Sequence, residues 1–93
     1  NNWKGDNKMI FNIRIKSPEE AQKLNKIAEK LPYDVWIHGK SGNADAKSLL
    51  GMMLLSLENE VKLVVEDNVD TKGLEKEIAD LLREKIKDLE NEN

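Results

Sequence analysis

Apolar and polar side chains alternate in two segments of the chain. In residues 9–15 (MIFNIRI), Phe11, Ile13 and Ile15 fall on one side, and residues 60–66 (EVKLVVE) repeat the alternation. A period of two is typical of a strand that buries one face. We therefore predict a strand over each segment.

Two short strands joined by a turn are expected in the middle of the chain. Val35 and Ile37 alternate with polar residues across residues 34–38, and the turn signal GKSG follows at residues 39–42. Residues 43–45 would complete the hairpin.

A helix is predicted over residues 18–30. Ser17 and Glu20 have the spacing of a capping box, and Pro18 stands where a missing N–H is harmless. Pro32 prevents continuation. Apolar residues then recur at helical spacing, at Ala21, Leu24, Ala28 and Leu31.

Two further helices are expected. Residues 46–57 (AKSLLGMMLLSL) are apolar on nearly every side, and their Leu and Met content favours a helix. Asp70 or Thr71 would cap the last helix, which is expected to run to about residue 89. Its apolar face would hold Leu74, Ile78, Leu81, Leu82 and Leu89.

The resulting order, β-α-β-β-α-β-α, predicts an α+β fold. Helices on one face of a four-stranded, mainly antiparallel sheet would bury the apolar side of every element. The length of 93 residues corresponds to one domain, expected over residues 9–89. Residues 1–8 show no periodicity and are expected to form a flexible extension, and residues 90–93 a frayed tail.

Composition and charge exclude several functional classes. The chain has no cysteine and one histidine, which excludes disulfides, thiol catalysis and a His-rich metal site. The net charge is −3, and residues 58–93 hold twelve acidic against six basic residues, which argues against nucleic-acid binding. The longest apolar run has seven residues, far below the roughly 20 of a membrane span. We expect no metal, cofactor, nucleic acid or membrane partner and a cytoplasmic location.

Residues 47–53 (KSLLGMM) resemble the regulatory-serine segment of HPr, the histidine-containing phosphocarrier protein of the sugar phosphotransferase system. The resemblance extends over about residues 9–89. It implies an open-faced β-sandwich of four strands with three helices on one face, in agreement with the element order above.

The resemblance also implies a departure at the family's active loop. In an ungapped comparison, Ser17 takes the place of the phosphorylated histidine and Glu19 that of the arginine. Glu20 stands where the family has proline. A phosphoserine ester is comparatively inert, and two carboxylates repel an arriving phosphate. The chain is therefore expected to lack phosphocarrier activity at this loop and to be no enzyme.

The same resemblance singles out the helix that follows Lys47. The resemblance implies that Ser48 corresponds to the serine that a dedicated kinase phosphorylates in the family. A phosphate at this position would be electrostatically favourable because it would lie at a helix N-terminus. Leu49, Leu50 and Met53 correspond to an exposed apolar patch that docks protein partners in that family, and Lys47 is expected to belong to the same partner-binding surface. Met52, Leu54 and Leu55 would then face the core.

These observations favour a non-catalytic HPr-like regulatory or protein-interaction domain, with Ser48 as a candidate phosphorylation site and a serine kinase as a candidate partner. Two alternatives stay open. The chain could be a phosphotransferase component that uses His38, its single histidine, or a structural domain of a larger protein.

Overall fold

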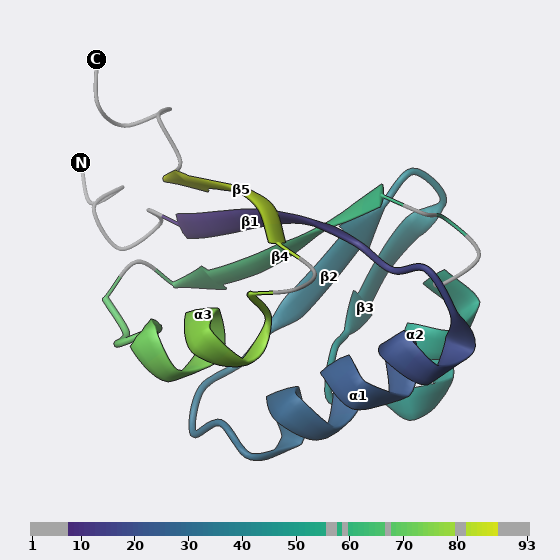
Figure 1. Ribbon diagram of the computed structural model, residues 1–93, viewed down its shortest axis with the longest axis horizontal. Helices are drawn as coiled ribbons and strands as arrows, with labels where there is room; N and C mark the ends of the chain where they lie inside the picture. The colour runs from purple at the N-terminus through teal and green to yellow at the C-terminus, as the bar shows by residue number, and fades with distance from the viewer. Residues whose placement is uncertain (1–7, 56–57, 59, 67, 80–81, 88–93) are drawn as a thin grey trace.

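The computed structural model describes residues 8–55, 58, 60–66, 68–79 and 82–87, the last range as backbone (Figure 1). These residues form, in order, β1 (Lys8–Arg14), α1 (Pro18–Glu29), β2 (Trp36–Gly39), β3 (Gly42–Asp45), α2 (Leu49–Leu55), β4 (Glu60–Glu66), α3 (Lys72–Glu77) and β5 (Leu82–Lys87).

The described strands form one antiparallel sheet in the order β3-β2-β4-β1-β5. The three described helices lie together below the sheet in Figure 1, so the molecule has a sheet layer and a helix layer. α1 packs against both α2 and α3. None of the described helices covers the opposite face of the sheet, which we name the open face.

The core lies between the two layers. Phe11 and Ile13 of β1, Leu24 of α1 and Met52 of α2 have no exposed surface. Burying a side chain of this size stabilises the fold by about 1.5–3 kcal/mol. The same core also includes Val35, Ile37, Val61, Leu63, Val65, Leu74 and Ile78.

The alternating pattern correctly separates the two faces of the sheet. In β2, Ile37 is buried beneath the helices, whereas Trp36 and His38 lie on the open face. Val64 of β4 is also buried, but it is paired in register with Trp36 and Ile10 and lies outside the main core. The open face therefore holds a small apolar row of its own.

The α+β class and the order of the first seven elements are confirmed. The helix predicted over residues 18–30 is α1, and the strand predicted over residues 60–66 is β4. The helix expected over residues 46–57 begins later, at Leu49, because residues 46–48 form a turn; residues 56–57 lie outside the described residues.

The four predicted strands, β1 to β4, and the three predicted helices are present in the order expected. The prediction that the last helix runs to about residue 89 is wrong, and a fifth strand is added to the four. α3 is a short helix that ends at Glu77, and residues 82–87 instead form β5. The segment LREKIK is rich in good helix formers, so local propensity favours a helix. Pairing with β1 satisfies backbone groups that would otherwise lie at a sheet edge, and this tertiary effect prevails.

Candidate functional site

The N-terminus of α1 is capped by its own side chains. Ser17 Oγ accepts a hydrogen bond from the Glu20 amide at 3.2 Å, and Glu20 Oε1 accepts one from the Lys16 amide at 2.7 Å. Pro18 follows Ser17 and has no N–H to satisfy. The predicted capping box is present, with Glu20 reaching Lys16 rather than the N-cap residue itself. Ser17 is half-buried and Glu19 is exposed.

Ser48 lies at the start of α2 and is exposed. Its hydroxyl oxygen accepts a hydrogen bond from the Gly51 amide at 3.1 Å, and its amide donates to the Asp45 carbonyl at 2.9 Å. Ser48 therefore acts as the N-cap of α2 while its side chain remains accessible to solvent.

Lys47 is held by the main chain. Its ammonium Nζ donates to the Leu31 carbonyl oxygen at 2.9 Å, just beyond the end of α1, and its amide donates to Asp45 Oδ1 at 2.9 Å. The side chain is half-buried. Lys47 thus links α1 to the turn before α2, and its charge is directed at Leu31 rather than at the exposed leucines of α2.

The outer side of α2 carries exposed leucines. Leu49 is 48% exposed, Leu50 70% and Leu54 62%. We name these three residues the α2 leucine patch. Leu54 was expected in the core, and it lies outside because the seven-residue helix turns Met52 and Leu55 inward instead.

Met53 borders the α2 leucine patch and is half-buried. It packs against the core from its rim. Of the residues expected to dock partners, Leu49 and Leu50 are therefore exposed, whereas Met53 and Lys47 are partly covered.

Gly51 allows α2 to lie directly on β3. A Cβ atom at this position would come within 2.7 Å of the Ala44 Cβ, closer than two carbon atoms approach without displacement. The absence of a side chain at Gly51 therefore sets the distance between the helix that carries the patch and the sheet. The sequence resemblance includes this glycine, but nothing in the sequence pattern indicates its contact.

His38 lies away from this helix layer. It is half-buried on the open face of the sheet, where β2 pairs it with Lys62 of β4 and with Asn43 of β3. The structure therefore does not bring His38 together with Ser17 or Ser48. Alternation in residues 34–38 places His38 on the outward side, but it does not indicate which residues lie beside it.

Glu58 is a residue that the sequence pattern did not single out. Its carboxylate accepts hydrogen bonds from the amides of Lys40 and Ser41 and from the Ser41 hydroxyl, so it closes the β2–β3 turn. The Ser41 hydroxyl bond, then the two amides, lower the pKa of Glu58 below its ordinary value of 4.5. The contact joins positions 17 and 18 residues apart, which no local pattern shows.

No group of three or more histidine and acidic side chains that could hold a metal ion occurs in the described part of the chain. Within the same ranges, no helix combines the length and the apolar composition needed to cross a membrane.

A protein-family model described as "PTS HPr component phosphorylation site" matches residues 19–84, more than two thirds of the chain. No curated protein and no solved structure matches.

Proposed function

The chain belongs to the family of HPr components of the phosphotransferase system, and from this membership we propose that it is a non-catalytic, cytoplasmic regulatory domain that binds protein partners of that system through α2. Proteins of this family interact with other proteins of the phosphotransferase system. The proposed departure from the family is that the chain binds such partners without carrying phosphate on the loop before α1.

The α2 leucine patch is the observation that carries this proposal. Three leucines on seven residues of helix are between 48% and 70% exposed. Large exposed apolar side chains gathered on one surface are typical of protein interaction sites. Burying each of them under a partner would contribute up to about 1.5–3 kcal/mol, before the costs of association.

The chemistry at the start of α1 supports the absence of phosphate transfer there. Ser17 takes the histidine position in the family resemblance, and its hydroxyl oxygen already caps the Glu20 amide. Glu19 adds a second carboxylate at the same helix end. Neither residue supplies the nucleophilic imidazole or the cationic partner that a transferable phosphoryl group needs.

The test combines binding and phosphate transfer with one defined partner, the first enzyme of the phosphotransferase system. We expect isothermal titration to detect binding and Leu50→Ser to weaken it at least about tenfold, which corresponds to 1.4 kcal/mol. Incubation with the enzyme and phosphoenolpyruvate is expected to leave no acid-labile phosphate on the chain.

Trp36→Gln is the matched control, because Trp36 is an exposed apolar side chain on the opposite face of the sheet. It should leave the affinity unchanged. Absence of binding by the wild-type chain, or equal loss of affinity in both variants, would contradict docking through α2.

Ser48 is the proposed regulatory position within this function. Its hydroxyl is exposed at the N-terminus of α2, where a phosphate dianion would be favoured by the first-turn amides. Phosphate on Ser48 would also place charge beside Leu49 and so weaken an apolar contact. A serine kinase that acts on this family, with ATP, is expected to modify the wild type and Ser41→Ala but not Ser48→Ala. Equal modification of the wild type and Ser48→Ala would exclude this position.

A second candidate function is phosphate transfer through His38. The observation in its favour is that Lys62 lies opposite His38 in the β2–β4 register, so a cation stands beside the only imidazole of the chain. In the incubation with phosphoenolpyruvate, acid-labile phosphate that disappears in His38→Gln would favour this function over the first. Absence of label in both proteins would reject it.

A further inference from the structure

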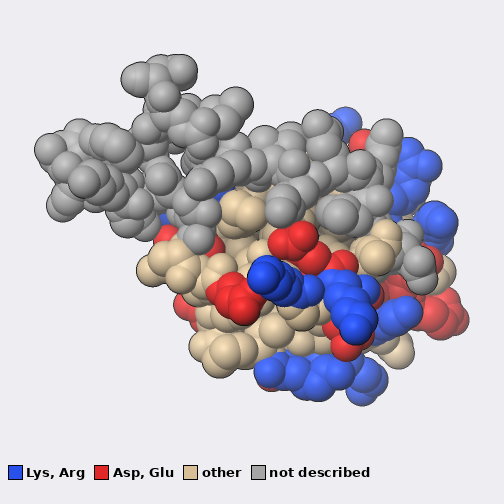
Figure 2. All heavy atoms as spheres, turned by 60° about the vertical axis from the view of Figure 1, so that its left-hand side comes forward, with Lys and Arg blue, Asp and Glu red and all other residues tan. Residues whose placement is uncertain are grey.

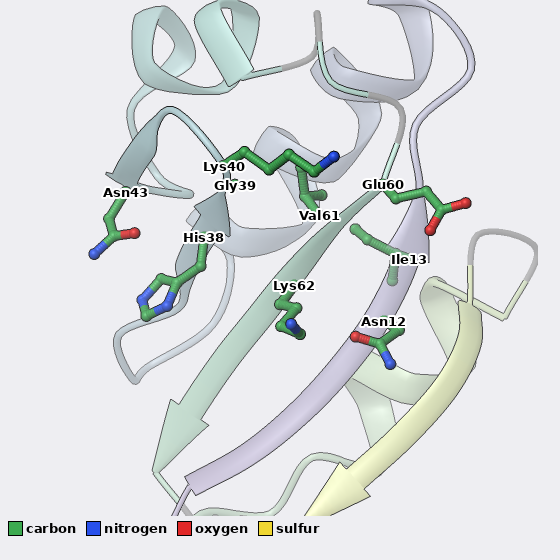
Figure 3. Close-up of a pocket in the computed structure, with 9 residues that line it drawn as sticks. All are labelled: Asn12, Ile13, His38, Gly39, Lys40, Asn43, Glu60, Val61 and Lys62. Atoms are coloured by element: carbon green, nitrogen blue, oxygen red, sulfur yellow. The ribbon is translucent and has the colours of Figure 1, made fainter.

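The open face of the sheet contains a depression on the side opposite the helices. Its volume is about 640 Å³, within the range of roughly 300–1,000 Å³ that holds small ligands. Figure 3 shows Lys62 near its centre, His38 and Asn43 on one side, and Lys40 extended across its upper end. The depression is separate from α2, which covers the other face of the sheet.

The antiparallel register brings these side chains together. Asn43, His38 and Lys62 are successive partners across β3, β2 and β4, and Asn12 of β1 continues the same row. Directly paired residues in neighbouring strands place their side chains on the same face about 5 Å apart. Four strands thus contribute one row of polar groups, held by the backbone of the sheet, and the register continues this row to Glu84 of β5 beyond Asn12.

The residue at the centre of this row, Lys62, is basic. Lys62 makes no salt bridge with an acidic side chain in the described ranges, whereas the charge of Lys40, at the upper end, acts on the neighbouring Glu58 carboxylate. The carboxylate at the rim, Glu60, is paired with Arg14 at 2.9 Å, so its charge is already opposed. The depression therefore has a positive charge at its centre, although the whole chain has a net charge of −3. Solubility alone does not require such a local positive charge.

We propose that the depression binds the phosphate group of a small phosphate monoester. Lys62 would oppose its negative charge, the imidazole of His38 would donate a hydrogen bond to one of its oxygens, and Lys40 would add a second cation from the upper end of the depression. Phosphate presents three acceptor oxygens, which suits donors arriving from separate strands. This binding is non-covalent and does not depend on either function proposed above.

The experiment is a titration followed by ¹H–¹⁵N NMR at constant ionic strength. Glycerol 3-phosphate should shift the signals of His38, Lys40, Asn43 and Lys62 in a saturable manner, with a Kd in the millimolar range. Glycerol should shift none of them. A second titration with inorganic phosphate distinguishes a free phosphate ion from a phosphate monoester as the ligand. If inorganic phosphate binds as tightly as glycerol 3-phosphate, the site recognises the phosphate group alone. If it binds more weakly, the organic part contributes to binding.

Lys62→Gln is the test variant, and Lys23→Gln is its matched control. Both residues are exposed, and Lys23 lies on α1 on the other side of the sheet. Lys62→Gln should weaken binding at least about tenfold, whereas Lys23→Gln should not change it. A spectrum that overlays that of the wild type checks that the variant is folded, and Lys40→Gln serves in its place if it is not.

Two results would overturn the proposal. One is a shift that grows without saturation or that sodium chloride reproduces, because this would indicate screening alone. The other is equal affinity in Lys62→Gln and the wild type. Neither result bears on partner binding through α2, which Lys62→Gln is expected to leave intact.

Discussion

Asn25 connects α1 to the segment before α2. It is 4% exposed, and its Nδ2 donates a hydrogen bond to the Ala46 carbonyl oxygen at 2.9 Å. Among the described residues, no buried side-chain nitrogen or oxygen lacks a hydrogen-bond partner. Loss of the Asn25 amide would leave the Ala46 carbonyl buried without this donor.

We expect Asn25→Ala to lower the free energy of unfolding by about 1–3 kcal/mol, the cost of an unsatisfied buried polar group. Urea denaturation measures this change. Gln22→Ala, on the exposed side of the same helix, is the control and should stay within about 0.5 kcal/mol of the wild type. A similar small change in Asn25→Ala would show that the hydrogen bond contributes little.

Adding a methyl group at Gly51 would have two opposing effects on the stability of the fold. Alanine is favoured over glycine within a helix by about 1 kcal/mol, but overpacking costs about 1–3 kcal/mol. Because the added Cβ would lie 2.7 Å from Ala44, we expect overpacking to prevail and Gly51→Ala to be destabilising.

A double-mutant cycle separates these effects in urea denaturation. Gly51→Ala should cost less in the background of Ala44→Gly, with a coupling energy of at least about 0.5 kcal/mol. Additive effects of the two substitutions would show that the helix accommodates the methyl group in another way.

Glu58 makes the β2–β3 turn sensitive to acid. Its folded-state pKa is lowered, chiefly by the Ser41 hydroxyl, so its hydrogen bonds stabilise the fold above the ordinary pKa of 4.5. That stabilisation is lost as the pH falls below this value and through the lowered pKa.

The expected result is that urea midpoints fall more steeply between pH 5 and pH 3 in the wild type than in Glu58→Gln. Glu29→Gln, exposed at the end of α1, is the control and should retain the wild-type slope. Equal slopes in the wild type and Glu58→Gln would contradict a role of the carboxylate.

At the residue scale, part of the candidate site could be predicted. The Ser17 cap and the exposure of Ser48, Leu49 and Leu50 agree with local spacing and with the family resemblance. The hydrogen bond of Lys47 to Leu31 spans 16 residues, and it depends on how α1 packs beside α2. Such contacts depend on tertiary structure, so no pattern of neighbouring residues in the sequence predicts them.

The elements of the chain differ in how fully local pattern determines them. β1, α1 and β4 each combine a clear period with a boundary signal, and their predicted bounds agree closely with the structure. α2 is apolar on nearly every side, so its period does not identify the inward face, and Leu54 was misplaced. β5 was not predicted because residues 82–87 favour a helix by local propensity, and only their pairing with β1 makes them a strand.

β5 leads to a prediction at the scale of the element. In NMR spectra we expect extended-backbone Cα shifts over residues 82–87 and NOEs between the Hα atoms of strand neighbours in β1 and β5, where Ile10 pairs with Ile86. Amides of β1 that face β5 should exchange slowly. Helical Cα shifts over residues 82–87 would contradict the fifth strand.

The whole molecule presents two faces with different character. The helix face carries the α2 leucine patch, whereas the open sheet face carries the row of polar side chains around His38. The side drawn toward the viewer in Figure 2 shows acidic and basic side chains interspersed, without a large area of one sign. The α2 leucine patch and the polar row therefore lie on opposite sides of one sheet.

Because one core joins the sheet to all three described helices, we expect the chain to unfold in a single transition. Far-UV circular dichroism reports on the helices, and Trp36 fluorescence, measured in Trp3→Phe, reports on the sheet. The two urea midpoints should coincide. Separate midpoints would show that the sheet and the helices unfold independently.

The position of β5 also bears on how the sheet avoids aggregation. β1 (KMIFNIR) and β4 (EVKLVVE) have the most apolar side chains of the described strands, and both lie inside the sheet, with β4 and β5 on the two sides of β1. The strands left at the described edges are β3, with the sequence GNAD, and β5, with four charged residues in LREKIK. Short polar strands and charged strands are poor templates for another chain. The segments most prone to form intermolecular β-structure are thus enclosed within the sheet.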